Sequence, residues 1–164
     1  MLYILEVRAK NALSYPYLHV KLGRNTTIIG PNDAGKSNLI RIIRIGTAAC
    51  DDSISLNDIY VAAGEILDQT KSAIIDIKFE LVLNNLSPQD IRRLGIFLTR
   101  AIPNLRLYAF PSGNNIEFSI RTEIKYDAFS NKGIAEHYFL NRWNDSINNA
   151  TIDSPISINS NFKP

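Results

Sequence analysis

The sequence predicts a mixed α/β fold, an α+β sheet whose antiparallel strands flank the helix that follows a glycine-rich loop. Three observations lead to this prediction. Residues 30–37 have the glycine spacing of a phosphate-binding loop that opens a helix. Residues 73–83 and 116–125 alternate between apolar and polar side chains, which is typical of strands with one packed face. With 164 residues, 45% of them apolar and 21% charged, the chain is long enough to bury a core.

The first part of the chain is predicted to form strands that lead into the loop. Strands are expected over residues 2–7 and 17–22, where apolar residues alternate with polar ones. Residues 26–29 are a β-branched run and are interpreted as a buried strand directly before the loop. The helix after the loop is expected to end at Gly46. Its apolar face is formed by Leu39, Ile40, Ile42, Ile43 and Ile45.

The second half is predicted to add one longer helix and further strands. Asp58 is a candidate N-cap for a short helix before residue 70. Ser87 and Pro88 indicate the start of the longer helix, as its N-cap and its first residue. Two strands, over residues 105–110 and 116–125, are expected to follow, joined by a loop rich in Pro, Ser, Gly and Asn.

The composition of the chain and its N-terminal residues predict its domain organisation and its cellular location. We assign one lobe to residues 1–143 and a polar tail, loosely held or forming a weak terminal strand, to residues 144–164. The N-terminus becomes charged at Glu6, too early for a signal peptide, and no apolar run is long enough for a bilayer. A cytoplasmic protein that does not enter a membrane is therefore expected. The net charge of +2 gives no argument of its own for nucleic-acid binding.

Residues 30–37, Gly-Pro-Asn-Asp-Ala-Gly-Lys-Ser, match the pattern G-x-x-x-x-G-K-[ST] at every fixed position. Gly30 and Gly35 let the backbone turn tightly, so that successive N–H groups point at a phosphate. Lys36 would add a cation at the β- and γ-phosphates, and the hydroxyl of Ser37 is the candidate ligand for Mg²⁺. The sequence therefore predicts ATP and Mg²⁺ as cofactors. GTP is disfavoured, because no Asn-Lys-x-Asp segment is present. The candidate nucleotide-binding residues are Gly30, Pro31, Asn32, Asp33, Ala34, Gly35, Lys36, Ser37 and Asn38.

The front of the chain carries a resemblance to a known group. Its residues are Lys-Asn-Ala-Leu-Ser-Tyr at 10–15, Val20, and Thr-Ile-Ile-Gly-Pro-Asn at 27–32. This register resembles the N-terminal lobe of ABC-type ATPases of the SMC and RecF group, although Ala12 and Leu13 stand where an aromatic and a basic residue are usual. Residues 32–40 are most similar to the overcoming-lysogenization-defect (OLD) family of ATPases.

The resemblance covers residues 1–45 well, is loose to residue 83, and is only topological beyond. It implies a P-loop NTPase fold, with residues 1–143 as the ATP-binding lobe. It also implies ATP-dependent action on DNA, in repair or in anti-phage defence, and a homodimer or a partner chain that completes the site. Asn38 would contact the α-phosphate or cap the helix.

Two motifs that such ATPases need are not found in the sequence. Residues 86–89, Leu-Ser-Pro-Gln, share two letters with the signature motif, but Pro88 replaces its glycine, so we interpret them as a helix cap. Asp76 ends an apolar run without a following Glu, so it is not a Walker B aspartate. Asp51 and Asp52 follow a helix and not a strand. No catalytic residue is therefore assigned, and ATPase activity stays undecided.

Three functions are compatible with these patterns. The first is the ATP-binding lobe of an SMC-like or OLD-like ATPase whose hydrolysis is completed by a missing C-terminal lobe or a partner. The alternative is a nucleotide-dependent interaction module without turnover. The third is an interaction domain in which the loop is unused. If the chain hydrolyses ATP alone, the carboxylates to test are Asp58, Asp76 and Glu80. A DNA-contacting face, or more simply a solvated one, is indicated by Arg92, Arg93, Arg100 and Arg106.

Overall fold

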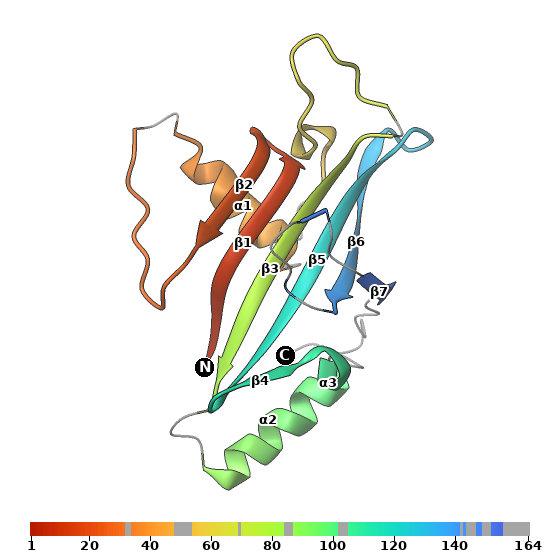
Figure 1. Cartoon of the computed structure of the whole chain (residues 1–164). Helices are drawn as coiled ribbons and strands as arrows, with labels where there is room; N and C mark the ends of the chain where they lie inside the picture. The colour runs from red at the N-terminus through yellow and green to blue at the C-terminus, as the bar shows by residue number, and fades with distance from the viewer. Residues whose placement is uncertain are drawn as a thin grey trace.

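The protein is built on one twisted sheet with few helices (Figure 1). This architecture is taken from a computed structural model, which describes residues 1–31, 34–47, 54–68, 70–83, 87–101, 105–141, 143, 147–148 and 152–155. The strands are β1 (Leu2–Ala12), β2 (Tyr15–Lys21), β3 (Ser72–Val82), β4 (Phe110–Ser112), β5 (Asn115–Asp127), β6 (Lys132–Leu140) and β7 (Ile152–Pro155). The helices are α1 (Lys36–Gly46), the short 3₁₀ helix η1 (Leu56–Asp58), α2 (Pro88–Ala101) and α3 (Leu105–Tyr108).

The sheet has the strand order β2-β1-β3-β5-β6-β7. Strand β4 pairs with the first residues of β5, Asn115 to Glu117. Every strand pairing among the described residues is antiparallel. The predicted mixed α/β character with antiparallel strands is therefore confirmed. This sheet does not show a P-loop NTPase fold. That fold has a strand directly before its phosphate loop, and residues 26–29, which precede the loop here, do not form one.

Helix α1 covers one face of the sheet and buries its apolar side there. Leu39, Ile42 and Ile45 are buried, as the helical spacing predicts, whereas Ile40 is 54% exposed. The sheet contributes alternate residues of its strands to the same core, because neighbouring side chains of a strand point to opposite faces. The buried sheet residues of this core are Val7, Ala9, Ala12, Ala73, Ile75, Ile77, Phe79, Phe118, Ile124 and Phe139.

Gly46 ends α1, as predicted, and brings it close to β3. A Cβ atom at Gly46 would lie 2.5 Å from Ile77 Cδ1 and 2.9 Å from Ile75 Cγ2. We expect Gly46→Ala to lower the free energy of unfolding by about 1–2 kcal/mol, because overpacking outweighs the gain in helix propensity. Urea denaturation measures this effect. Gly23→Ala is the control, since the nearest atoms there are 3.8 Å away; an equal loss in both variants would contradict the packing argument.

The predicted strand over residues 26–29 is wrong. This segment leaves the sheet and runs beside it, with Ile28 40% and Ile29 89% exposed (Figure 1). A turn redirects the chain, because Thr26 Oγ1 accepts from Gly23 N–H at 2.8 Å and donates to Gly23 O at 3.1 Å. β-Branched residues favour a strand only where a neighbouring backbone can pair with them. The described part of the chain places no strand beside this run.

Two further expectations are corrected by packing. Residues 105–110 form α3 and the start of β4 instead of one strand, because Leu105 is buried and Tyr108 stacks on Phe139, with ring centroids 4.8 Å apart. Asp58 does not begin a helix. It ends η1, whose N-cap is Ser55.

The remaining expectations hold in part. Pro88 opens α2 and the Ser87 hydroxyl accepts from the Asp90 N–H at 3.1 Å, which confirms the helix cap. The weak terminal strand of the tail is confirmed over Ile152–Pro155, which pairs with β6. The other tail residues lie outside the described ones, apart from residues 147–148. No helix within the described ranges is long and apolar enough to cross a membrane.

Candidate functional site

The candidate phosphate loop connects the exposed segment before it to the N-terminus of α1. Gly30, Pro31 and residues 34–38 are described, whereas Asn32 and Asp33 lie outside the described residues. Inside the loop, Ala34 N–H donates to Pro31 O at 3.1 Å, which makes a tight turn. The first turn of α1 contains no acidic residue, so no carboxylate within that turn offsets its N–H groups and positive dipole end. This is the arrangement that favours an anion at a helix N-terminus.

Gly35 is the N-cap of α1 and has the left-handed conformation, with φ 79° and ψ 9°. A side chain there would be strained and would also collide, since a Cβ atom would lie 2.3 Å from Tyr15 Oη. The predicted need for glycine is therefore confirmed at this position. Gly30 has no positive φ, and among the described residues a Cβ there would meet Ala34 Cβ at 3.2 Å.

Lys36 is folded back over the loop that precedes it. Its Nζ donates to Gly30 O at 2.6 Å and to Pro31 O at 2.5 Å. The ammonium group therefore lies at the mouth of the loop, held by two neutral carbonyl groups. A phosphate would be a better acceptor than either carbonyl, because its negative charge adds Coulomb attraction to the hydrogen bond from the ammonium group.

Ser37 and Asn38 occupy the first turn of α1. Ser37 is exposed, as a metal-binding hydroxyl would have to be. Asn38 Nδ2 donates to Ser14 Oγ at 2.7 Å, so its side chain connects the helix to the corner between β1 and β2. Because Gly35 is the N-cap, a capping role for Asn38 is wrong. Its contact with the α-phosphate stays a prediction.

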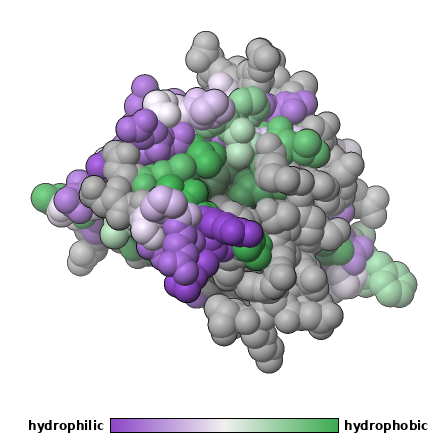
Figure 2. Space-filling model, turned by 90° about the horizontal axis from the view of Figure 1, so that it is seen from below, coloured by the Kyte–Doolittle hydropathy of each residue, from purple (hydrophilic) through white to green (hydrophobic). Residues whose placement is uncertain are grey.

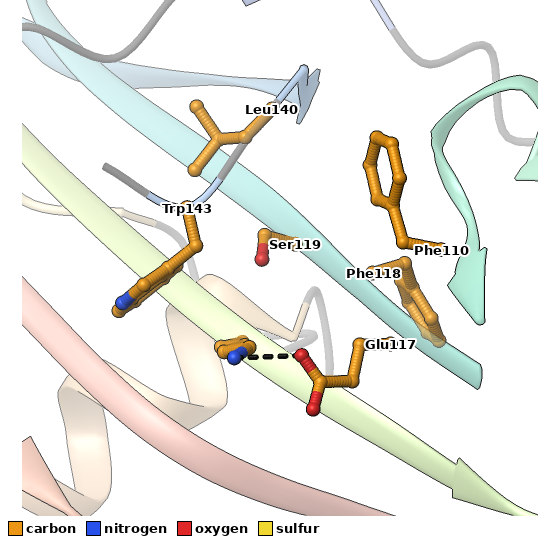
Figure 3. Close-up of a pocket in the computed structure, with 7 residues that line it drawn as sticks. Phe110, Glu117, Phe118, Ser119, Leu140 and Trp143 are labelled. Carbon is orange, nitrogen blue, oxygen red and sulfur yellow. Dashed lines mark ion pairs between the residues drawn. The ribbon is translucent and has the colours of Figure 1, made fainter. Parts of the chain in front are cut away.

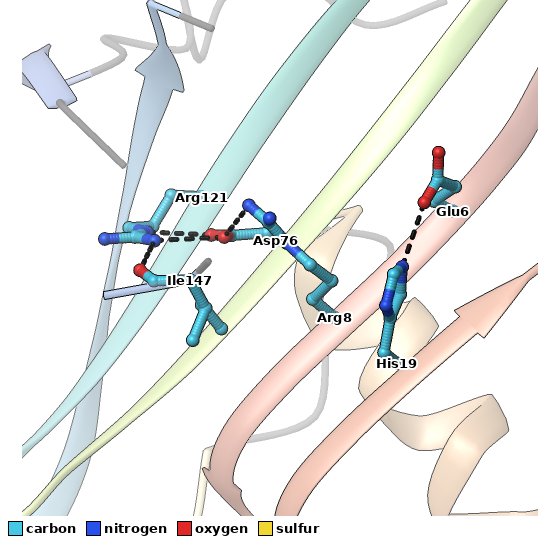
Figure 4. A network of polar contacts seen from close by, with 6 residues as sticks. All are labelled: Glu6, Arg8, His19, Asp76, Arg121 and Ile147. Carbon is cyan, nitrogen blue, oxygen red and sulfur yellow. Dashed lines mark hydrogen bonds and ion pairs between the residues drawn. The ribbon is translucent and has the colours of Figure 1, made fainter. Parts of the chain in front are cut away.

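Asp76 belongs to a buried charge cluster on the face of the sheet opposite α1 (Figure 4). Its carboxylate accepts from Arg8 Nη2 at 2.9 Å and from Arg121 Nε at 2.7 Å. Arg121 Nη2 also donates to Ile147 O at 2.6 Å, and the Trp143 ring lies 3.9 Å from the Arg8 guanidinium. Asp76 therefore joins strands β1, β3 and β5 and does not face the phosphate loop. This placement agrees with the sequence argument against a Walker B role.

The other two candidate carboxylates are also engaged. Asp58 accepts two hydrogen bonds from Arg41, at 2.5 and 2.7 Å, and one from Ser55 N–H at 2.8 Å. Burial raises the pKa of Asp58, but the bonds from Arg41 and Ser55 outweigh it, so the net pKa is lowered and the group stays ionised. Glu80 accepts from Asn115 Nδ2 at 2.8 Å. Neither carboxylate is presented to the loop as a base. Asp51 and Asp52 lie outside the described residues.

A second concave site lies on the charged face of the sheet. It is a cavity of about 370 Å³ that contains the 2.7 Å ion pair between Lys78 and Glu117, with Trp143 on one side and Phe110 and Phe118 on the other (Figure 3). Seen from below, apolar residues border part of a hollow in the molecule, and hydrophilic residues lie next to them (Figure 2). None of its described lining residues belongs to the phosphate loop. It is lined by Lys78, Phe110, Glu117, Phe118, Ser119, Leu140 and Trp143.

The two histidines have structural partners. His19 Nε2 lies 2.9 Å from Glu6 Oε2, across β2 and β1 (Figure 4). His137 Nδ1 lies 2.8 Å from Thr122 Oγ1, and burial lowers the pKa of this imidazole. Throughout the described ranges, no three His, Cys, Asp or Glu side chains gather into a metal-binding group.

The basic residues expected near α2 do not form a described patch. Arg92 and Arg93 are exposed on α2, while the side chains of Arg100 and Arg106 lie outside the described ones. Two exposed arginines on a helix fit a solvated face, as the sequence allows.

Sequence reasoning missed two contacts of the loop, those of Ser14 and Tyr15. Only the position of these residues in the resemblance register pointed to them. No protein-family model and no curated protein matches the chain. The assignment therefore depends on the loop and its surroundings.

Proposed function

We propose that this chain is the ATP·Mg²⁺-binding lobe of an SMC-like or OLD-like ATPase with a P-loop NTPase fold. One observation carries the proposal: α1 begins at Lys36, directly after a left-handed Gly35, so the first N–H groups of the helix, which have no partner within it, lie where the loop ends. ATP would bind through residues 30–38, with Lys36 moving from the loop carbonyls to the β- and γ-phosphates and Ser37 binding Mg²⁺.

Hydrolysis would be completed by a C-terminal lobe or a partner chain, including a second copy in a homodimer. Support comes from the engaged carboxylates, because Asp58 and Asp76 are each held by arginine. The exposed run at residues 26–29 supplies a surface for the completing lobe. Ile29 is 89% exposed there, and an extended β-branched segment is suited to pair with a strand from elsewhere. Action on DNA, in repair or anti-phage defence, is proposed from the resemblance alone.

The alternative is a nucleotide-dependent interaction module that binds ATP and does not turn it over. The same engaged carboxylates favour it. In that case ATP would change the affinity of the chain for its partner, and release of the nucleotide would be slow.

Turnover separates the two proposals. We expect the purified 164-residue chain to bind ATP with micromolar affinity and to release no phosphate above the rate of uncatalysed hydrolysis, because the three candidate carboxylates, Asp58, Asp76 and Glu80, are held by other side chains. Phosphate release is measured with a coupled assay, with and without Mg²⁺. Addition of the completing chain should raise the rate if the ATPase proposal is correct. Robust turnover by the chain alone would contradict both proposals and would call for Asp58→Asn and Glu80→Gln.

A further inference from the structure

The corner between β1 and β2, residues 11–15, contacts the phosphate loop at two points. Tyr15 Oη donates to Gly35 O at 3.0 Å, and Asn38 Nδ2 donates to Ser14 Oγ at 2.7 Å. We propose that this β1–β2 corner is a positioning element of the nucleotide site, in which Tyr15 and Ser14 orient the backbone where the loop joins α1. The inference rests on the proposed function.

The Tyr15 hydrogen bond fixes one peptide plane of the site. The peptide between Gly35 and Lys36 is trans and planar, so its carbonyl and its N–H point in opposite directions. Gly35 O accepts from Leu39 N–H, the first hydrogen bond of α1, and also from Tyr15, each at 3.0 Å. With the carbonyl held from two sides, the N–H of Lys36 is directed away from the helix, where a phosphate would accept it.

The β1–β2 corner has a strained backbone that the rest of the fold holds in place. Asn11 and Leu13 have φ angles of 52° and 53°, and a positive φ is uncommon for a branched residue such as Leu13. Leu13 N–H donates to Asp58 O at 3.0 Å, and Tyr60 N–H donates to Asn11 O at 2.8 Å. Asp58 in turn pairs with Arg41 of α1. Strain that is kept by surrounding contacts is concentrated at functional sites in proteins.

Together these contacts join three elements around the start of α1. The β1–β2 corner holds Gly35 and Asn38, and residues 58–60 hold the corner. The orientation of the backbone at the start of α1 is thereby set before any nucleotide arrives. Preorganised amides cost no reordering on binding, so loss of this support should weaken nucleotide affinity more than it weakens the fold.

Tyr15→Phe tests the proposal, because it keeps the ring beside Gly35 and removes only the hydroxyl. We expect the Kd for Mg·ATP to rise about five- to tenfold, the range for one lost hydrogen bond. In the nucleotide-free protein, the backbone amide resonance of Lys36 should move. Ser14→Ala should also raise the Kd for Mg·ATP and should move the Lys36 resonance in the same direction as Tyr15→Phe does. The matched control is Tyr17→Phe, since Tyr17 is exposed on the same strand and should change neither.

A second control separates positioning from stability. Ile124→Val removes a methylene group from the buried core of β5 and should lower stability without changing the Kd. The inference is overturned if Tyr15→Phe leaves the Kd and the Lys36 resonance unchanged, or if Ile124→Val weakens binding equally. A wild-type protein that binds no ATP would refute the proposed function. The Lys36 resonance would then still decide whether Tyr15 orients the loop.

Discussion

Lys36→Ala is expected to abolish measurable ATP binding, with the Kd rising by about 100-fold or more. In the proposed complex the ammonium group makes charge-assisted hydrogen bonds to the β- and γ-phosphates, and each such bond contributes about 1.5–3 kcal/mol. The loop would keep its amides, but these alone cannot balance the charge of a triphosphate. Isothermal titration with Mg·ATP measures the loss. The fold should be unaffected, because the partners of Lys36 Nζ are Gly30 O and Pro31 O in an exposed loop.

The control for this result is Lys132→Ala, which removes an exposed cation at the start of β6. It changes the net charge of the protein by the same amount as Lys36→Ala, so it corrects for any general attraction between a cationic protein and ATP. We expect this control to bind ATP like the wild type. Equal affinities in all three proteins would rule out residues 30–38 as the nucleotide site.

Asp76→Ala should be the most destabilising single substitution proposed, at about 3–5 kcal/mol. Removal of the carboxylate leaves Arg8 and Arg121 as neighbouring buried cations without their shared anion, and both are at most 7% exposed. The loss of the buried anion costs more than any packing that alanine could restore, because the two guanidinium groups stay close together in the sheet. Urea denaturation of the purified variant measures the change in free energy of unfolding.

The control for Asp76 is Glu65→Gln, which breaks the exposed ion pair with Lys71. Solvent screens that pair, so its loss should hardly change the free energy of unfolding. Asp76→Asn keeps the volume of the side chain, and its folded fraction should bind Mg·ATP with the wild-type Kd. Loss of Mg²⁺-dependent binding in well-folded Asp76→Asn would show instead that Asp76 belongs to the nucleotide site.

Local rules predict the loop and α1 well. A glycine spacing, a lysine and an apolar helical face are all set by neighbouring residues, so Gly35 at the N-cap and Gly46 at the helix end follow from the sequence. The alternation over residues 73–83 and 116–125 likewise predicts β3 and β5, because a sheet with a packed face imposes a period of two.

Tertiary context decides the rest of the fold. The run at residues 26–29 has strand propensity but no described neighbour, and residues 105–108 become helical because Leu105 and Tyr108 pack on one side. Strand β6 was not predicted. Its first two residues are Lys132 and Gly133, and polar and apolar residues do not alternate regularly along it.

The same limit applies to the candidate site. Its backbone is local, but the residues that orient it are distant in sequence: Tyr15 is 20 residues from Gly35, and Ser14 is 24 from Asn38. Likewise, Arg8 and Asp76 meet only because β1 pairs with β3. Alternation alone places Asp76 on the polar face of its strand, which is expected to be exposed to solvent. It gives no sign that residues from the end of the chain, Trp143 and Ile147, cover this face.

An NMR titration with Mg·ATP tests the central claim most directly, because it reports on each backbone amide separately. We predict that the resonances of Gly30 and of residues 34–38 move with a single Kd and that those lining the aromatic cavity, such as Ser119 and Trp143, stay in place. Saturable changes confined to the cavity, or no saturable change at any amide, would contradict the assignment of the loop as the nucleotide site.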